Sequence, residues 1–560
     1  MRLLIAIVAV ILANILFSNF FHRFDLTKEK RFSVSKATKN LLEDLNDVVY
    51  VEIFLSGELP ADYRRFQNAL IDLLNEYRAY SGRKIEYTFT DPFEGRESAD
   101  ETNKFVVSLM EHGLEVRQIA QQSLQETTRK FIIPGAMVRY QGRDVAVNFL
   151  PEQNMNEPTD EVISNGISTL EYNLSNAIRK LQKVENEKIG FLLGHGEAES
   201  IFLADIAGTL KQQQFDVERV DISRQIGISP TFSVLVIAKP TQEFSEQDKF
   251  KIDQFIMQGG KILWLIDGLK AEMDSLFKQT ETAAFLTEDY QLNLDDMLLQ
   301  YGARVNDDLV QDLQSAKIPL FAANSRQPVY YSWPYFPIIF PEVNHPIVKH
   351  LDPILFNFAS SVDTTGAPGI KKTILLTSST NSRTLLNPVR VSLLQATQEP
   401  MPEQYNKSNI PVAVLLEGEF TSIFKFRPPT EDFLRIYQDS LQRQFRDKSS
   451  ATKMIVVGDG DIIKNEIGRN GVPSKLGYYR YNPNYVYANK NFILNSIDYL
   501  VDNYGLIATR TKDFKTRPLN TDELKENVLK WQMINLIVPI ILILIFALIY
   551  NLVRKRKYAR

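Results

Sequence analysis

The residues best suited to chemistry form a short turn, Gly194-His195-Gly196-Glu197, directly after an apolar run that predicts a strand. An imidazole and a carboxylate two residues apart could act as an acid/base pair. Alternatively, the turn could bind an anion at the N-terminus of a following helix. The structural alternative is that the glycines form a tight turn and Glu197 meets the positive end of the helix dipole. We keep all four residues as candidate ligand-binding residues and assign no catalytic residue.

Three aspartates that follow predicted strands form a second candidate site. Asp267 ends the run Ile262–Ile266, and Asp459 and Asp461 follow the run Met454–Val457. If these strands belong to one parallel sheet, the three carboxylates meet at one edge and could bind a divalent cation. Acidic residues at strand ends are also common turn formers. We therefore predict no metal and regard these aspartates as weak candidates.

Several kinds of chemistry are excluded by what the sequence lacks. The chain has no cysteine, so it has no disulfide, thiolate nucleophile or cysteine-ligated metal, and its five histidines are mostly scattered. It contains no G-x-x-x-x-G-K-[ST] phosphate loop, no G-x-S-x-G elbow, no H-E-x-x-H and no G-x-G-x-x-G after a strand. We predict no cofactor and no enzymatic activity.

The composition is that of a folded protein that does not bind nucleic acid. Hydrophobic residues make up 44% and charged residues 24% of the chain, which is ordinary for globular proteins. The formal net charge is -4, and no basic stripe occurs outside the C-terminal tail. A nucleic acid is therefore an unlikely partner by charge.

Two long apolar runs stand at the ends of the chain. The first is Leu3–Phe21 and the second is Met533–Val553. A helix that crosses the hydrocarbon core needs roughly 20 apolar residues, and both runs reach that length. The alternative for the first run is a cleaved signal peptide, but it is longer than a usual signal h-region and lacks a clean small-x-small cleavage site. We predict an uncleaved anchor at 1–22 and a second span at 533–553.

The orientation in the membrane follows from the charges beside the second span. Arg554, Lys555, Arg556, Lys557 and Arg560 follow it without an acidic residue, and such positive flanks stay cytoplasmic. Two spans then place both termini in the cytoplasm and the large middle segment in the periplasm. The predicted location is the inner (cytoplasmic) membrane.

The sequence pattern of the first soluble region, 23–150, predicts an α/β domain. A β-branched run at 48–55, a helix after Pro60 and an alternating strand at Ile85–Phe89 predict a β-α-β unit with parallel strands. Two further runs, 131–140 and 145–150, flank Gly142 and predict a hairpin. A β-α-β unit followed by a hairpin resembles the thioredoxin-like arrangement, although without cysteine it cannot perform thioredoxin chemistry.

The second soluble region, 186–508, alternates strands and helices, which predicts a doubly wound parallel sheet. Strands are expected at 188–193, 215–221, 234–238 and 262–266, with a helix capped by Ser245 that has Asp248 at its third position, close to a capping box. The late run Met454–Val457 and a helix at 492–501 could complete the same sheet, which makes about 270–453 a large insertion or a further domain of β structure. A polar linker and connecting helix occupy 151–185, a charged stalk 509–532, and a basic tail 554–560.

The whole layout resembles the gliding-motility ABC-transporter accessory family that includes GldG. The resemblance rests on the opening segment Arg23–Leu42, the segment Val51–Pro60, the turn in Phe191–Glu197, the VVGDGD strand end and the C-terminal span. It implies a partner ABC ATPase and a multi-span permease that act in gliding. It also implies a glutamine-amidotransferase-like α/β domain without its catalytic cysteine.

The sequence therefore predicts a non-catalytic, extracytoplasmic accessory subunit of an ABC transporter complex, with an unknown ligand. A chain with two anchors and no phosphate loop suits a subunit that takes its energy from another protein. Two alternatives stay open at this point. One is an extracytoplasmic hydrolase that uses His195 and Glu197, and the other is a passive envelope scaffold.

Overall fold

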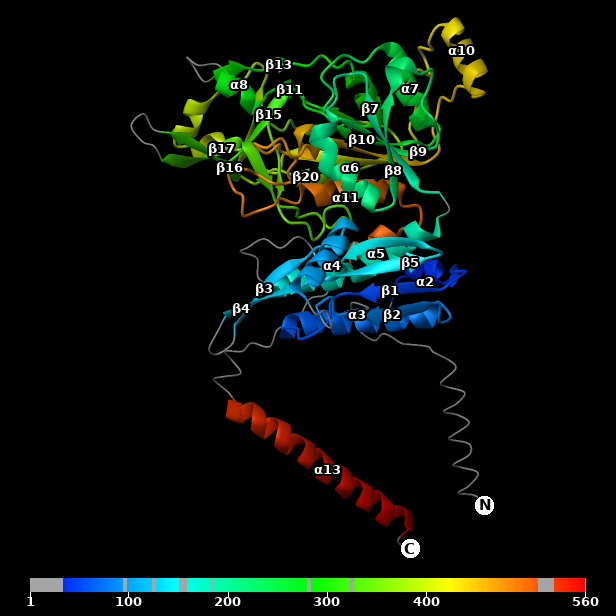
Figure 1. Ribbon diagram of the computed structural model, residues 1–560, viewed down its shortest axis with the longest axis vertical. Helices are drawn as coiled ribbons and strands as arrows, with labels where there is room; N and C mark the ends of the chain where they lie inside the picture. Colours follow the sequence, from blue (N-terminus) through cyan, green and yellow to red (C-terminus); the bar gives the residue numbers. More distant parts are fainter. Residues whose placement is uncertain are drawn as a thin grey trace. The chain divides into compact units, whose positions relative to one another are not determined.

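The computed structural model describes residues 34–93, 98–122, 127–150, 159–183, 185–278, 284–321, 327–511 and 528–558. Figure 1 shows their helices and strands. The described residues form a mixed α/β protein, as the sequence predicts. The chain divides into two compact units, Met1–Asp513 and Phe514–Arg560, and each is described by itself.

The N-terminal part of the first unit contains a four-stranded sheet of order β2-β1-β5-β6. β1 (Val49–Ile53) and β2 (Ile85–Phe89) are parallel and are joined by α3 (Ala61–Tyr80). β5 (Gly135–Tyr140) and β6 (Arg143–Asn148) form an antiparallel hairpin, and β5 also pairs with β1. The predicted β-α-β unit and hairpin are therefore confirmed.

Helices cover this sheet, and two elements between β2 and β5 were not expected from the sequence. The flanking helices are α2 (Lys36–Glu43) and α5 (Thr159–Gln182), whose apolar residues share one core with α3 and the sheet. The unexpected elements are helix α4 (Ala99–Glu111) and a hairpin of β3 (Arg117–Gln122) and β4 (Thr127–Ile132). Neither contains the long apolar run that predicted the other elements.

The second part of the first unit is built on a seven-stranded sheet of order β20-β23-β24-β10-β9-β7-β8. Five neighbouring strands are parallel, which confirms the predicted sheet and the place of the late strand β24 in it. These are β7 (Glu187–Leu193), β8 (Phe215–Asp221), β9 (Phe232–Ala238), β10 (Lys261–Leu265) and β24 (Thr452–Val457). The strand order reverses between β7 and β9, and in such sheets that reversal point is where ligands usually bind.

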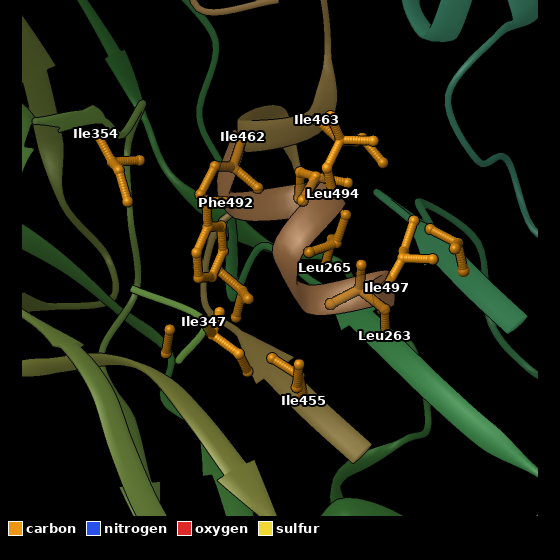
Figure 2. Close-up of a cluster of buried hydrophobic side chains, with 14 of the residues drawn as sticks. Leu263, Leu265, Ile347, Ile354, Ile455, Ile462, Ile463, Phe492, Leu494 and Ile497 are labelled. Atoms are coloured by element: carbon orange, nitrogen blue, oxygen red, sulfur yellow. The ribbon is translucent and has the colours of Figure 1, made fainter. Parts of the chain in front are cut away.

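Buried residues alternate between the two faces of this sheet, and helices cover both. On one face lie η1 (Ser200–Leu203), α6 (Ala204–Gln212) and α11 (Asn489–Val501). On the other lie α7 (Glu246–Met257) and α9 (Asp295–Tyr301). Figure 2 shows α11 with Phe492 and Ile497 packed over strand residues such as Leu263 and Ile455. A core on both faces explains why these strands read as continuous apolar runs.

The chain between β10 and β24 supplies the β structure expected for 270–453, and two of its strands join the main sheet. β23 (Pro411–Gly418) pairs antiparallel with β24, and β20 (Ile370–Thr377) pairs with β23. The remaining strands form small antiparallel sheets: β11 (Leu269–Lys270) with β13 (Glu288–Asp289), β12 (Ala284–Leu286) with β22 (Arg390–Ser392), β14 (Ala303–Val305) with β19 (Val362–Thr364), β15 (Asp308–Asp312) with β21 (Ser382–Leu386), and β16 (Ser315–Phe321) and β18 (Ile354–Leu355) with β17 (Pro328–Ile339). The short helices of this segment are α8 (Met273–Lys278), η3 (Leu393–Thr397), η4 (Pro402–Gln404) and α10 (Glu431–Leu441). Outside it lie the 3-10 turns η2 (Ile222–Arg224), η5 (Asp461–Ile463) and η6 (Leu506–Thr511).

The described part of the second unit is one helix, α13 (Val528–Tyr558), which contains Pro539. Its stretch Lys530–Lys557 has a mean hydropathy of 2.9 and is long and apolar enough to cross a membrane. The predicted span at 533–553 lies within this helix. The predicted anchor at 1–22 lies outside the described residues, as do the linker residues 151–158 and most of the predicted stalk.

Candidate functional site

The Gly194–Glu197 turn follows β7 directly, at the carboxyl end of the sheet beside the end of β9. Gly194 and Gly196 have φ angles of +116° and +70°, which side chains other than glycine rarely adopt. A Cβ atom on Gly196 would also lie only 2.1 Å from the Thr241 Oγ1 atom. Two independent constraints, backbone conformation and close packing, therefore require glycine at position 196.

The chain itself fills the crevice at the point where the strand order reverses. The backbone N–H groups of Thr241 and Gln242 both donate to the His195 carbonyl oxygen, each at 2.9 Å. The Thr241 hydroxyl donates to the Gly196 carbonyl at 2.9 Å, and the Ala198 N–H donates to the Ala238 carbonyl at 2.9 Å. The position where related sheets hold a ligand is thus bridged by hydrogen bonds between the β7 and β9 ends.

The His195 side chain is buried between two carboxylates and an aromatic ring. Its Nε2 atom lies 3.2 Å from Asp248 Oδ2, and its Nδ1 atom lies 3.4 Å from Glu197 Oε1. The imidazole stacks on the Phe244 ring with centroids 3.8 Å apart and planes 7° from parallel. Burial lowers the pKa of His195, but the nearby carboxylates of Asp248 and Glu197 outweigh it and raise that pKa to about 9. At neutral pH the ring is therefore an imidazolium.

This protonation state decides what the ring can do. A protonated imidazole whose two nitrogens face carboxylates has no free nitrogen to accept a proton, so it is poorly placed as a general base. Asp248 is held by three partners, since it also accepts from Lys251 Nζ at 2.8 Å and from Ser245 Oγ at 2.7 Å. Burial raises the pKa of Asp248, but these hydrogen bonds hold it below its usual value.

Glu197 does not meet a helix dipole, contrary to the structural alternative drawn from the sequence. The 3-10 turn η1 begins only at Ser200, and α6 begins at Ala204. The Glu197 Oε2 atom instead accepts the backbone N–H of His195 at 2.8 Å. The structure therefore brings His195 and Glu197 together, but the facing Nδ1 and Oε1 atoms, 3.4 Å apart, form no hydrogen bond. The ligand-binding hypothesis for the four turn residues stays a prediction.

The three strand-end aspartates also come together, but a lysine lies among them. Lys239, the residue after β9, places its Nζ atom 2.7 Å from Asp461 Oδ2 and 3.0 Å from Asp267 Oδ2. Asp459 is fully buried beside them and accepts backbone N–H groups of Asp461 and Asn357, each at 2.7 Å. An ammonium group thus occupies the position at which the sequence suggested a divalent cation.

The charges of this cluster are strongly coupled. Burial lowers the pKa of Lys239, but Asp267 and Asp461 hold it well above its usual value. Burial raises the pKa of Asp461, and the cations Lys239 and Lys464 bring it down to about 2. For Asp459, burial and the neighbouring Asp267 and Asp461 raise the pKa well above its usual value. One proton on Asp459 would relieve the repulsion among the three carboxyl groups.

No metal site is evident in the described part of the chain, where no group of three or more metal-ligating side chains is arranged to hold an ion. Asp267, Asp459 and Asp461 stay weak candidates. Sequence reasoning missed Lys239, although a lysine before Pro240 at the end of a buried strand was a usable signal. Only the fold shows that it meets aspartates from two other strands.

A third polar cluster, also missed from the sequence, joins α5 to α11. Lys180 Nζ lies 3.3 Å from Asp498 Oδ1, and the Tyr172 hydroxyl donates to Asp498 Oδ2 at 2.8 Å. All three side chains are buried, beside a cavity of about 760 Å³. Burial lowers the pKa of Lys180, and Asp498 opposes that effect. This cluster ties the N-terminal region to the large sheet.

Two models of known protein families match this chain, and one of them covers the His195 and Lys239 clusters described above. Residues 186–496 match the family model described as "ABC-type uncharacterized transport system", and residues 28–139 match a domain of unknown function. The chain belongs to this ABC-type transport family. Its members are auxiliary components of ABC transport systems, so the chain is a transporter accessory protein. The matched segment includes the His195 turn, Lys239 and all three aspartates.

Matches to individual proteins extend the comparison beyond residues 186–496, but their names state no activity. An uncharacterized protein of Borreliella burgdorferi is 24% identical over 567 residues, covering 99% of this chain and 97% of that protein. Among solved structures, the chain is similar to "mmIFT52 N-terminal domain" with 12% identity and a TM-score of 0.31, covering 56% of this chain and 98% of that one. The first similarity extends over both regions of the first unit and α13.

Proposed function

We propose that this protein is a non-catalytic accessory subunit of an ABC transporter complex and works with a separate ATPase subunit and a multi-span permease subunit. The observation that carries the proposal is the family match over residues 186–496, which spans the large sheet and its charge clusters. The lack of a phosphate loop in the sequence supports it, because ATP hydrolysis would then come from another chain.

The proposed location is the inner membrane, with the middle segment in the periplasm and both termini in the cytoplasm. Helix α13 supports this by its length and hydropathy, and the basic residues Arg554–Lys557 at its end support a cytoplasmic C-terminus. The anchor at 1–22 completes the proposed topology. On this basis the domain layout proposed from the sequence, with soluble regions at 23–150 and 186–508, lies outside the cytoplasm.

Finer features of the proposal rest on resemblance. We propose a thioredoxin-like first domain, supported by its β-α-β unit and hairpin, and an amidotransferase-like second domain, supported by its parallel sheet. A role in gliding motility rests on the motifs in Arg23–Leu42 and Phe191–Glu197. A hydrolase is less well supported, because His195 is an imidazolium between two carboxylates.

The test of the accessory role is purification of the tagged full-length protein from its own membranes in mild detergent, with mass spectrometry of the proteins that accompany it. The expected result is an ABC ATPase and a multi-span membrane protein in constant proportion, absent from an untagged control. A chain that purifies alone, even after crosslinking in cells, would overturn the proposal. The same preparation should show no ATPase activity of its own once partners are stripped away.

The topology has a clean test because the chain contains no cysteine. Ser440→Cys would place one thiol on the exposed part of α10, and Tyr558→Cys would place one beyond the span. A membrane-impermeant maleimide applied to cells with a permeabilised outer membrane should label only the first variant, and the wild-type chain is the blank. Labelling of the second variant alone would reverse the proposed orientation.

A further inference from the structure

A cavity of about 410 Å³ lies just beyond the carboxyl end of β24. It is enclosed by η5, the start of α11, the start of α8 and the inserted strands β17 and β18. Cavities of roughly 300–1,000 Å³ are typical of small-molecule sites, and the carboxyl ends of parallel strands are where such sites gather. Asp461, a weak metal candidate in the sequence, lines this cavity, but neither the sequence motifs nor the proposed transport role assigns an organic ligand to it.

Hydrogen bonds and apolar packing join the elements that form one wall of the cavity. The Asn489 side chain at the start of α11 accepts the Leu355 N–H at 3.1 Å and donates to the Leu355 carbonyl at 2.8 Å, which joins the helix to β18. Beneath it, Ile462 and Ile463 of η5 pack against Phe492 of α11, as Figure 2 shows. A preformed wall lowers the entropy cost of binding.

One polar atom in this wall lacks a partner. The Asn357 side-chain oxygen is buried and has no hydrogen bond within the described structure. The backbone N–H of the same residue is bonded to Asp459, so the position of Asn357 is fixed. A buried carbonyl without a donor destabilises the fold, and a ligand N–H group would remove that penalty.

Aromatic rings line another side of the cavity. Tyr479 and Tyr481 have ring centroids 5.3 Å apart at 87°, and Phe336 lies edge-on to Tyr479 at 6.4 Å. The Tyr479 hydroxyl is already used, because it donates to the Lys317 carbonyl at 2.9 Å. The half-buried Tyr481 ring and the small exposed part of the Tyr479 ring therefore remain as the means of contact, and aromatic faces attract cations.

The charges around the cavity favour a cation. Its two lining cations are neutralised: Lys464 lies 2.8 Å from Asp461, and Arg480 lies 2.6 Å from Glu466. Asp274 adds a third carboxylate to the lining, and behind Asp461 the Asp267 and Asp459 carboxyl groups lie around the Lys239 ammonium. Carboxyl groups thus outnumber cations, and low-dielectric walls strengthen the resulting negative potential.

We propose that this cavity binds a small organic amine in its ammonium form. The Asn357 carbonyl would accept one N–H, the Tyr479 and Tyr481 rings would contact the charged head and its carbon chain, and the surrounding carboxylates would balance its charge. The binding site is independent of which transporter subunits the protein joins.

The test is calorimetric titration of the full-length protein in detergent with n-butylammonium chloride, beside n-butanol as the neutral molecule of the same carbon chain. We expect saturable binding of the amine and none of the alcohol. Asn357→Leu, which removes the acceptor at similar volume, and Tyr481→Leu should each weaken binding about tenfold. Tyr504→Leu, an exposed tyrosine outside the cavity, is the matched control and should change nothing.

Three results would overturn the proposal. These are the absence of amine saturation up to about 10 mM, equal binding of butanol, and full affinity in both cavity variants. If either variant fails to fold by urea titration, Asp274→Asn replaces it, because that side chain is exposed and its exchange removes one carboxylate only. Amine affinity that is unchanged in folded Asp274→Asn and in the remaining cavity variant would count against the site.

Discussion

Two buried charge clusters lie at the carboxyl ends of neighbouring strands in the same sheet, and their charges are balanced differently. After β7, the His195 imidazolium faces Asp248 and Glu197, and Lys251 also contacts Asp248. Two cations therefore meet two carboxylates. The backbone of the turn is closed by hydrogen bonds to the chain after β9. This cluster, called the balanced cluster below, joins the ends of β7 and β9 through contacts within the chain.

The cluster around Lys239 has three carboxyl groups and two cations, so its charges balance only with a proton on Asp459. Lys239 contacts Asp267 and Asp461, Asp459 lies buried beside them, and Lys464 contributes a second cation to Asp461. This cluster also borders a cavity, through Asp461. The balanced cluster lies at the carboxyl edge of the sheet, where the strand order reverses, but the chain fills that position. The unbalanced cluster around Lys239 lies at the same edge and borders a cavity. A position at the carboxyl edge of the sheet is therefore not enough to identify a binding site.

The largest expected effect comes from removing the central cation of the unbalanced cluster. Lys239→Met would leave the buried Asp267 without its ammonium partner and the partly buried Asp461 with Lys464 alone, and breaking a buried ion pair typically costs about 3–5 kcal/mol. Urea unfolding of the full-length protein in detergent, followed by the fluorescence of buried Trp264 and Trp333, measures this loss.

The matched control for that variant is Lys270→Met, which removes a half-exposed lysine that lies 3.7 Å from Glu288 and 5.7 Å from the centre of the Tyr290 ring. Its expected cost is below about 1 kcal/mol, as for surface ion pairs. Equal losses of unfolding free energy in the two variants would show that Lys239 contributes no more than a surface ion pair. That result would contradict the difference between the two clusters.

The balanced cluster should show itself in the pH dependence of stability. The pKa of His195 is raised from 6.5 to about 9, so its stabilising effect is complete below pH 6.5 and is lost as the pH rises through 9. The shift is worth up to ~3 kcal/mol. The free energy of unfolding of wild type should therefore fall between pH 7 and 10 relative to His195→Gln. A constant difference across this range would show that the ring is uncharged at pH 7.

A glycine pair separates backbone strain from packing at the balanced cluster. Gly196 and Gly471 have similar φ angles, +70° and +75°, but a Cβ on Gly471 would meet nothing within 4 Å. Gly471→Ala should cost about 1 kcal/mol from the positive φ alone. Gly196→Ala should cost about 1–3 kcal/mol more, because its methyl group would overlap the Thr241 hydroxyl. Urea midpoints of the two variants give the difference, and equal midpoints would refute the close packing of the turn.

The elements that sequence reasoning located share a physical signature. The strand Ile85–Phe89 was readable because apolar and polar residues alternate in it, β10 because of the apolar run Ile262–Ile266, and the start of α7 because of its Ser245 cap. Helix α4 and the β3-β4 hairpin lack such runs and were missed. The entry of β20 and β23 into the main sheet depends on pairing between distant segments, which no local pattern encodes.

The candidate site residues were found from their types, but their partners were not. Asp267, Asp459 and Asp461 were grouped correctly at one sheet edge because each follows a strand. Lys239 was absent from that group, since its contact with Asp461 joins residues 222 positions apart. His195 was paired with Glu197, its near neighbour, whereas Asp248 was recognised only as part of a helix cap. Charge balance, the property that distinguishes the clusters, is therefore set by tertiary contacts.

The smallest expected effect tests whether that helix cap belongs to the balanced cluster. Ser245 accepts the Asp248 N–H at 3.1 Å and donates to the Asp248 carboxylate at 2.7 Å, so Ser245→Ala removes a cap and a carboxylate partner. Ser98 caps α4 at 3.2 Å in an exposed position, and Ser98→Ala is the control. A cap alone is worth about 1 kcal/mol. We expect Ser245→Ala to exceed the control by several tenths of a kcal/mol in urea unfolding. The alkaline loss of stability should persist, because His195 keeps both carboxylates. Equal losses of unfolding free energy in the two variants would mean that the balanced cluster holds Asp248 in place without help from the cap.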